Sequence, residues 1–221
     1  PARFKYMKTT NTEFGHISDI VINEALAYPD INFTLKHNQK QVLNTPGTGK
    51  LKDSIYEIYG KELANNLLPI DFKDKFIKVS GFIAKPNFSR SSRIYEKFFV
   101  NQRAIKNSTI SYAVEEAYQG LLPPKKYPIV FLNIKLNPIL VDVNVHPAKK
   151  EVKFSRNQII KDVIKKGIKN QLDQIDPAPK VDINSNNKKP ENKKNKSSLF
   201  NNKSHNKSNT KDNTQKNNIN N

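Results

Sequence analysis

Apolar residues recur at helical spacing in four segments of the chain. The first segment follows Thr10-Asn11-Thr12-Glu13, a capping box in which the Thr10 hydroxyl and the Glu13 carboxylate satisfy each other's backbone amides. Periodicity of this kind places apolar side chains on one face of an amphipathic helix. The predicted helices cover about residues 12–27, 51–59 (closed by Gly60), 110–118 (capped by Ser108 or Thr109) and 159–172 (after a second capping box, Ser155–Gln158).

Segments that alternate between apolar and polar residues predict strands between these helices. Residues 31–35 alternate in this way, and His37-Asn38-Gln39 predicts a turn into a second strand over 41–43. Further strands are predicted over residues 67–71, 76–84, 95–100, 103–105, 128–136 and 140–145. Because strands and helices interleave without an internal repeat, we predict a single two-layer α/β domain, followed by a linker that begins near Asp176.

The composition changes abruptly near the C-terminal end. Residues 184–221 contain 14 Asn, 9 Lys and 2 acidic residues, with few large apolar side chains. Such a segment cannot bury enough apolar surface to offset the entropy lost on ordering, so we predict a disordered tail. The tail carries +7 of the net charge of +18, which leaves +11 for residues 1–183. This excess favours an anionic partner, nucleic acid before membrane; compositional drift in the tail and a merely solvated basic surface are the alternatives.

Several functional classes are excluded by the residues present. The chain has no cysteine, so it holds no disulfide, thiolate metal site or cysteine nucleophile. Its four histidines are scattered and show no metal-binding spacing, so we expect no metal site. No apolar run is long enough to span a membrane, and no signal peptide is visible. The chain opens on Pro1 and its only methionine is Met7, so we expect a fragment of a longer protein.

The segment Thr45-Pro46-Gly47-Thr48-Gly49-Lys50 partly matches a phosphate-binding loop. That motif requires glycine at position 44 and a Ser or Thr after the lysine, where this chain has Asn44 and Leu51. Without that hydroxyl the motif has no side-chain ligand for magnesium. We therefore interpret the segment as a flexible loop.

Residues 141–152 form the most unusual stretch. Alternation places three valines on one face of a predicted strand and leaves Asn144 and His146 on the other, as a solvated surface or as part of a site. A proline then ends the strand, since it has no amide hydrogen to donate. The loop that follows presents Lys149, and a lysine at the end of a strand suits a point contact with a phosphate.

A second basic segment surrounds a predicted hairpin turn. Val100-Asn101-Gln102-Arg103 places an arginine at the turn, with Lys97 and Lys106 close in sequence. An exposed arginine at a turn is usually only solvated. The alternative is a DNA-contact patch that consists of Arg103, Lys97 and Lys106.

Four motifs, in the family's order, resemble the MutL family of DNA mismatch-repair proteins. VDVNVHPAKKEVKF over residues 141–154 closely resembles the family signature, and FFVNQR over 98–103 is similar to its hairpin. PARFK over 1–5 resembles the segment that closes the family's ATPase domain, and TEFGHI over 12–17 resembles a helix start of the family. Together the motifs span about residues 1–175. VNVHPAK and FVNQR favour this family over the related gyrase-type and heat-shock-chaperone ATPases.

The resemblance implies a fold and a division into domains. The fold is the transducer domain of a GHKL-type ATPase, a small mixed sheet with helices on one face and a left-handed βαβ crossover. Residues 1–10 would end the preceding ATPase domain, 11–175 would form the transducer domain, and 176–221 would begin the linker.

The resemblance also implies roles for individual residues. Lys149 matches the family lysine that contacts the γ-phosphate of ATP bound in the preceding domain, and Asn144 and His146 would shape that strand end. Because its partner charge disappears on hydrolysis, such a lysine reports the ATP state. Arg103, with its lysine neighbours, matches the arginine associated with DNA binding, a contact to the backbone that is salt-dependent and independent of sequence.

The chain departs from the family in two respects. Gln102 stands where the family usually has glycine, and a non-glycine residue is disfavoured at positive φ in a tight hairpin. The catalytic ATPase domain would lie before Pro1, so we expect no ATP binding or hydrolysis by this chain alone. ATP and Mg²⁺ are cofactors of the whole protein in this interpretation.

We therefore expect a role in DNA mismatch repair that couples mismatch recognition to strand excision. The implied partners are DNA, the upstream ATPase domain, a second copy of the protein and the mismatch-recognition protein MutS, in the bacterial cytoplasm. The alternative is a stand-alone basic nucleic-acid-binding module without a link to nucleotide.

Overall fold

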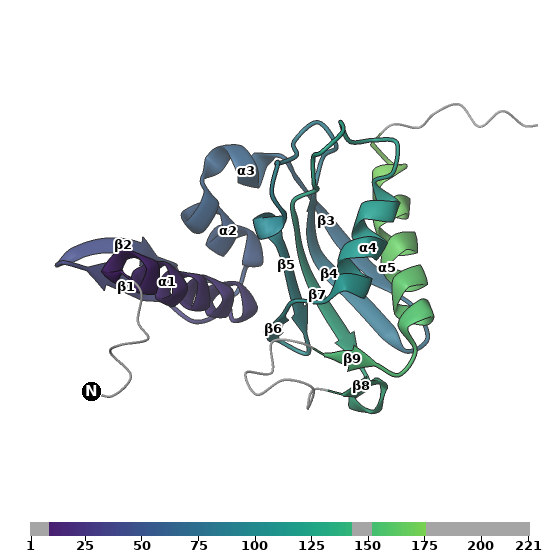
Figure 1. Cartoon of the computed structure of the whole chain (residues 1–221), viewed down its shortest axis with the longest axis horizontal. Coiled ribbons are helices and arrows are strands. Elements are labelled where there is room, and N and C mark those ends of the chain that lie inside the picture. Colours follow the sequence, from purple (N-terminus) through teal and green to yellow (C-terminus); the bar gives the residue numbers. More distant parts are fainter. Residues whose placement is uncertain (1–8, 143–151, 176–221) are drawn as a thin grey trace, which may run out of the picture. The chain divides into compact units, whose positions relative to one another are not determined.

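The computed structural model describes residues 9–142 and 152–175 (Figure 1). The predicted tail lies outside the described residues. The first elements are α1 (Thr10–Ala27), β1 (Thr34–His37), β2 (Lys40–Asn44), α2 (Leu51–Tyr59) and α3 (Lys61–Asn65). They are followed by β3 (Leu67–Lys73), β4 (Ile77–Ala84), the 3-10 turn η2 (Arg93–Tyr95), β5 (Glu96–Val100), β6 (Arg103–Ile105), α4 (Ser108–Ala117), β7 (Val130–Leu136), the 3-10 turn η3 (Pro138–Leu140), β8 (Val141–Asp142), β9 (Lys153–Phe154) and α5 (Asn157–Leu172).

Five strands form one mixed sheet in the order β3-β4-β7-β5-β6. β4 is antiparallel to both β3 and β7, β5 is parallel to β7, and β6 pairs with β5 at the edge. The chain passes from β5 to its parallel neighbour through β6 and α4, so the expected βαβ crossover is present, while its left hand stays a prediction. β3 tolerates Pro69 because it is an edge strand, with a partner on one side only.

Helices α4 and α5 cover one face of this sheet, which confirms the predicted two-layer arrangement (Figure 1). Apolar side chains from the strands and both helices interdigitate between the layers. Members of this core include Ile70, Ile77, Val79, Phe98, Val100, Ile110, Val114, Leu132, Ile134, Ile160, Ile164 and Ile168. At the surface, Lys161 and Lys165 of α5 both form ion pairs with Glu116 of α4, which links the two helices.

The opposite face of the sheet is covered at one end by α1, α2 and α3. There, Phe99 of β5 and Phe131 of β7 belong to a second buried cluster with Leu26 of α1, Ile55 of α2 and Leu63 of α3. Towards the β3–β4 turn, this face instead carries polar and charged side chains from β3, β4 and β7.

Two predicted helix caps are displaced by one residue. Thr9 caps α1, because its hydroxyl accepts a hydrogen bond from the Thr12 amide at 3.3 Å, and Thr10 is already helical. Asn107 caps α4 in place of the two hydroxyl residues that follow it, because its side-chain oxygen accepts from the Ile110 amide at 3.1 Å. In each case the preceding residue also offers a capping oxygen, and sequence alone does not decide between neighbours.

The second predicted capping box does not form. The residue before α5 is Arg156, and no side chain caps this helix. Gln158, expected to reach back to the cap, instead donates to the Asp162 carboxylate one turn further along, at 2.8 Å. This i, i+4 bond competes with the box for the same amide group.

The N-terminal hairpin forms as predicted, although β1 begins at Thr34 rather than at residue 31. Its turn residues Asn38 and Gln39 have φ values of 48° and 63°, the left-handed conformation of a type I′ turn. α2 has its predicted bounds and ends at Gly60, with a φ of 87°. α3 was not predicted, because its five residues are too few for periodicity to indicate a helix.

Candidate nucleic-acid interface

The turn between β5 and β6 presents the predicted arginine. Asn101 and Gln102 have φ values of 49° and 66°, so the expected difficulty with a non-glycine residue does not prevent a left-handed turn. The Asn101 side chain offsets this strain, since its amide donates to the Leu136 carbonyl at 3.0 Å and accepts from the Leu136 amide at 3.1 Å. These bonds fix the turn to the end of β7 and leave Arg103 exposed at the edge of the sheet.

The two lysines predicted beside Arg103 lie in different environments. Lys106 follows β6 and is exposed. The Nζ atom of Lys97 lies 2.8 Å from an Asp19 carboxylate oxygen on α1, and its side chain is 14% exposed. The structure therefore presents Arg103 and Lys106 to solvent and places Lys97 in an intramolecular ion pair.

A row of lysines that was not predicted lies on the open face of the sheet, the face that α4 and α5 leave uncovered. The strand register pairs Lys73 of β3 with Lys78 of β4, and Lys78 in turn with Lys135 of β7. Paired residues project to the same side, so these three side chains, here called the lysine row, share the face opposite α4 and α5. Their distance in sequence hides the row, and only the register of the strands could indicate it.

A groove of about 480 Å³ runs along the lysine row. Its lining includes the three lysines, the β3–β4 turn with Lys75 and Phe76, and the turn residues Asn101 and Gln102. The groove thus extends from one hairpin turn to the turn that precedes Arg103. Basic groups occupy both the open face and the edge of this end of the sheet.

The residues predicted to contact ATP, Asn144, His146 and Lys149, lie outside the described residues. The structure describes the strands on either side of them: β8 and β9 pair antiparallel, with Val141 opposite Phe154. Asn107 donates to the carbonyl of Val152 at 2.9 Å and so joins this segment to the start of α4.

The loop over residues 45–50 is not the flexible loop that we expected. Thr45 is fully buried; its amide donates to the Phe33 carbonyl at 2.9 Å, and its hydroxyl accepts from the Phe33 amide at 3.0 Å. Further along, the Gly49 amide donates to the Pro29 carbonyl at 2.9 Å. These bonds hold the loop against the segment between α1 and β1, which composition alone did not indicate.

Residues 9–142 and 152–175 contain no group of three or more His, Cys, Asp or Glu side chains that could hold a metal ion. Within the same residues, no helix combines the length and the apolar character needed to cross a bilayer.

Comparison with known proteins agrees with the motifs. Residues 55–173 match the family described as DNA mismatch repair protein, C-terminal domain. A DNA mismatch repair protein MutL of Halothermothrix orenii is 62% identical over 186 residues, which cover 84% of this chain and 29% of that protein. The chain belongs to the MutL family of DNA mismatch-repair proteins. The family match begins within α2, so α1 and the β1–β2 hairpin precede it.

Other MutL relatives show the same partial coverage. The MutL protein of Geobacillus sp. strain WCH70 is 43% identical over 183 residues, which cover 83% of this chain and 30% of that protein. The chain thus spans about 30% of the length of these relatives.

Solved structures share the fold. The crystal structure of the N-terminal domain of a DNA repair protein matches 79% of this chain and 57% of that one, with a TM-score of 0.66 and 23% identity. The ATPase domain of the mismatch repair endonuclease MutL from Aquifex aeolicus matches 76% of this chain and 56% of that one, with a TM-score of 0.52 and 16% identity. At such identities the likeness concerns the fold alone.

Proposed function

We propose that this chain links the ATP state of an upstream domain to contact with the DNA backbone during mismatch repair. Residues 11–175 act as the transducer domain, residues 1–10 end the ATPase domain, and 176–221 begin the linker. The observation that carries the proposal is the exposed Arg103, held at the edge of the sheet by the rigid Asn101 turn within a MutL-type fold. ATP and Mg²⁺ bind in the upstream domain rather than in this chain.

The DNA contact is electrostatic. Arg103 and Lys106 are exposed at the same edge, and both can approach phosphate oxygens without reading base edges. Lys97, also predicted to contact DNA, forms an ion pair with Asp19 on α1 and contributes less free charge to this surface. Binding should therefore be independent of sequence and strongly weakened by salt.

Exposed apolar residues in the N-terminal region are consistent with contact with an upstream ATPase domain. Four large apolar side chains of α1, the β1–β2 hairpin and the segment between them are about half exposed: Ile17, Ile20, Ile31 and Val42. Should these side chains form one contiguous apolar patch, it would suit an interface with another domain. Lys149, with Asn144 and His146, would contact the γ-phosphate in that domain, and the whole protein would dimerise and act with MutS in the bacterial cytoplasm.

The DNA contact is tested by measuring the affinity of the full chain for duplex DNA at several salt concentrations, by fluorescence anisotropy. Arg103→Gln should lower the affinity and reduce the slope of log K against log salt by about 0.9, the value for one lost phosphate contact. Lys126→Gln removes the same charge from the exposed loop before β7 and should leave the slope unchanged. An Arg103→Gln slope equal to that of the control would overturn the proposed contact.

The tail is tested separately by comparing residues 1–183 with the full chain. Duplex binding that disappears without residues 184–221 and ignores Arg103 would instead favour a stand-alone basic module, with the tail as its polycation.

The ATP contact is tested in the protein that carries the upstream domain. Lys149→Ala should lower ATPase activity because the γ-phosphate loses a compact positive charge, whereas Lys150→Ala is the adjacent control. Equal activities for the two variants would contradict the sensor role of Lys149.

A further inference from the structure

The lysine row places like charges next to one another. Lys73 and Lys78 are directly opposite on antiparallel strands, and so are Lys78 and Lys135. Strands lie about 4.8 Å apart, so the row covers about 10 Å across the sheet. Like charges directly opposite destabilise a sheet. Asp71 neutralises one of the three through a 2.9 Å ion pair with Lys78, and the Asp74 side chain also lines the groove. With Lys75 of the turn included, four lysines stand against two carboxylates, so an excess of positive charge remains.

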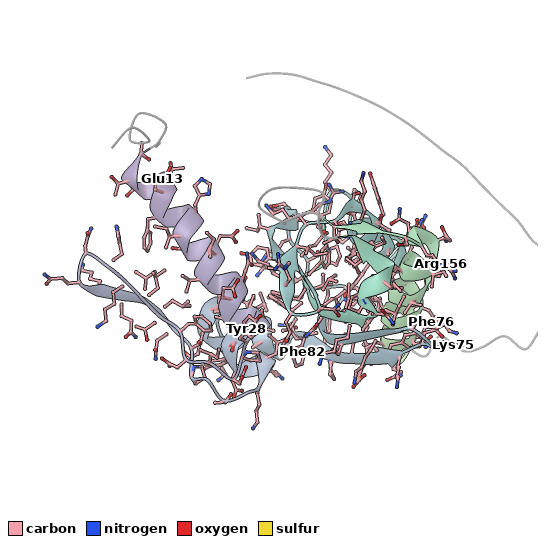
Figure 2. All side chains as sticks on the ribbon, turned by 90° about the horizontal axis from the view of Figure 1, so that it is seen from below. Glu13, Tyr28, Lys75, Phe76, Phe82 and Arg156 are labelled. Carbon is pink, nitrogen blue, oxygen red and sulfur yellow. The ribbon has the colours of Figure 1, made fainter. Side chains whose placement is uncertain are left out.

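An aromatic ring stands at the end of this row. Phe76 lies in the β3–β4 turn, where the Asp74 amide donates to the Ile77 carbonyl at 2.9 Å and holds the turn in place. Its side chain is 54% exposed although turns are normally polar, and it lines the groove with the lysine row. Lys75 Nζ lies 5.3 Å from the centroid of the Phe76 ring, and Figure 2 shows the two residues together at this turn.

The lysine row and the exposed Phe76 ring together favour one kind of anionic partner over others. A small anion would require an enclosed pocket, whereas this groove is open and its charges are spread across three strands. In duplex DNA the bases are stacked on each other, so no base face is available to a protein ring. An unpaired strand offers both a phosphate backbone for the lysines and a base face for Phe76.

The geometry points to a single-stranded nucleic-acid segment that crosses this end of the sheet, with its phosphates on Lys73, Lys78 and Lys135 and one unpaired base stacked on Phe76. This inference rests on the proposed nucleic-acid contact and adds a second surface to it, on the open face rather than at the Arg103 edge. The strand would pass along the groove towards Asn101 and Gln102, and so reach the turn that precedes Arg103.

The test uses the full chain and two labelled single strands of equal length and charge, an oligothymidine and an abasic oligonucleotide. Phe76→Ala should weaken binding of oligothymidine about five- to tenfold, the lower part of the range for loss of one stacked base, and should leave the abasic strand unaffected. Phe76→Trp, which keeps an aromatic ring at this position, should retain the preference for oligothymidine that Phe76→Ala loses. Leu121→Ala removes a comparably exposed apolar side chain from another loop and should change neither affinity.

The lysine row is tested by measuring the affinity for single strands at several salt concentrations. The double variant Lys73→Gln/Lys135→Gln should reduce the slope for single strands by about 1.4, because each lost phosphate contact contributes about 0.7. The double variant Lys125→Gln/Lys126→Gln removes two charges from the loop before β7 and should leave the slope unchanged. The tail is identical in all variants, so its contribution cancels.

Each result separates this inference from the proposed function. Equal slopes for the two double variants, or equal losses on thymidine and abasic strands in Phe76→Ala, would overturn the single-strand surface. If Arg103→Gln still weakened duplex binding in the same experiment, the proposed function would stand without it. If neither Arg103 nor the lysine row affected binding, both would fail.

Discussion

Two regions of this chain have amphipathic sequences but bury them to different extents. Between the five-stranded sheet and helices α4 and α5, apolar side chains from every layer are almost completely buried. In α1 the buried residues are confined to Ala25, Leu26 and Ala27, at the C-terminal end, while Ile17 and Ile20 further up the helix are about half exposed.

This difference shows that apolar periodicity indicates which face of a helix is to be covered, but not which part of the protein covers it. An apolar stripe at helical spacing requires a covering surface, but it does not specify where that surface comes from. α4 and α5 find it in the sheet of the same chain. α1 finds it mainly towards its C-terminal end, where Leu26 and the partly buried Ile22 pack against the cluster around Phe99 and Phe131. Near the other end, the Phe14 ring stacks on His37 of β1, with the ring centroids 4.0 Å apart. The rest of its apolar face is what we propose to be the docking surface for the upstream ATPase domain.

Replacing a glycine by alanine should change the free energy of unfolding in opposite directions in the two regions, which is the largest difference that we expect between them. Gly81 of β4 has a φ of 128°, and a Cβ atom there would overlap the carbonyl oxygen of Phe131 on β7. Gly81→Ala should therefore lower the free energy of unfolding by about 3 kcal/mol or more. Gly15 of α1 has open space around it, so Gly15→Ala should raise this free energy by up to about 1 kcal/mol. Urea unfolding followed by circular dichroism measures both, and a similar cost at the two sites would remove the contrast.

Isoleucine truncations sharpen the comparison at side chains. Ile164 of α5 is fully buried, so Ile164→Ala should cost about 2–4 kcal/mol through lost burial and a residual cavity. Ile20 of α1 is 53% exposed, and Ile20→Ala should change the stability of this chain by less than about 0.5 kcal/mol. A cost above about 2 kcal/mol at Ile20 would mean that α1 already has its full covering surface.

A smaller effect concerns a carboxyl group at the sheet–α4 boundary. Burial raises the pKa of Glu96 to about 7, and the nearby Glu115 carboxylate acts in the same direction, against a hydrogen bond from Ser111 and the charge of Arg93. Glu96 Oε1 has no hydrogen-bond partner among the residues described.

Because the pKa is higher in the folded than in the unfolded chain, stability should fall as the pH rises from about 4.5 to 7 and stay low above that range. Glu96→Gln should remove this fall and add about 1–2 kcal/mol at pH 8, after allowance for partial solvent access, with little change at pH 4. Thermal unfolding at the two pH values measures the difference. An equal shift at both pH values would contradict the account of Glu96.

Local patterns predicted most of the elements but not their partners. The Asn38-Gln39 turn, the α2 helix closed by Gly60, and the β5–β6 hairpin follow from neighbouring residues, because each depends on the backbone preferences of a few positions. β3 extends two residues beyond its predicted end because pairing with β4 continues to Lys73 and Lys78. Such pairing is a property of two strands together.

In the candidate site too, features that depend on neighbouring residues could be predicted, and those that depend on distant residues could not. Arg103 and its exposure could be predicted, since the hairpin is local. The ion pair that draws Lys97 towards Asp19 joins residues far apart in the chain, and no local pattern indicates it. The lysine row is the clearest case: three unremarkable surface lysines become a charged surface only once three strands are aligned in register.

The most direct test maps nucleic-acid binding on the isotope-labelled full chain by amide NMR shifts. In the proposed arrangement, DNA lies on the sheet end that carries the lysine row and Arg103, and α1 with the β1–β2 hairpin contacts another protein domain. Single-stranded and duplex DNA should therefore shift the amides of the β3–β4 turn, the β5–β6 turn and the end of β7, and leave residues 10–44 unchanged. Shifts centred on α1 and the hairpin, or confined to residues 184–221, would contradict this arrangement.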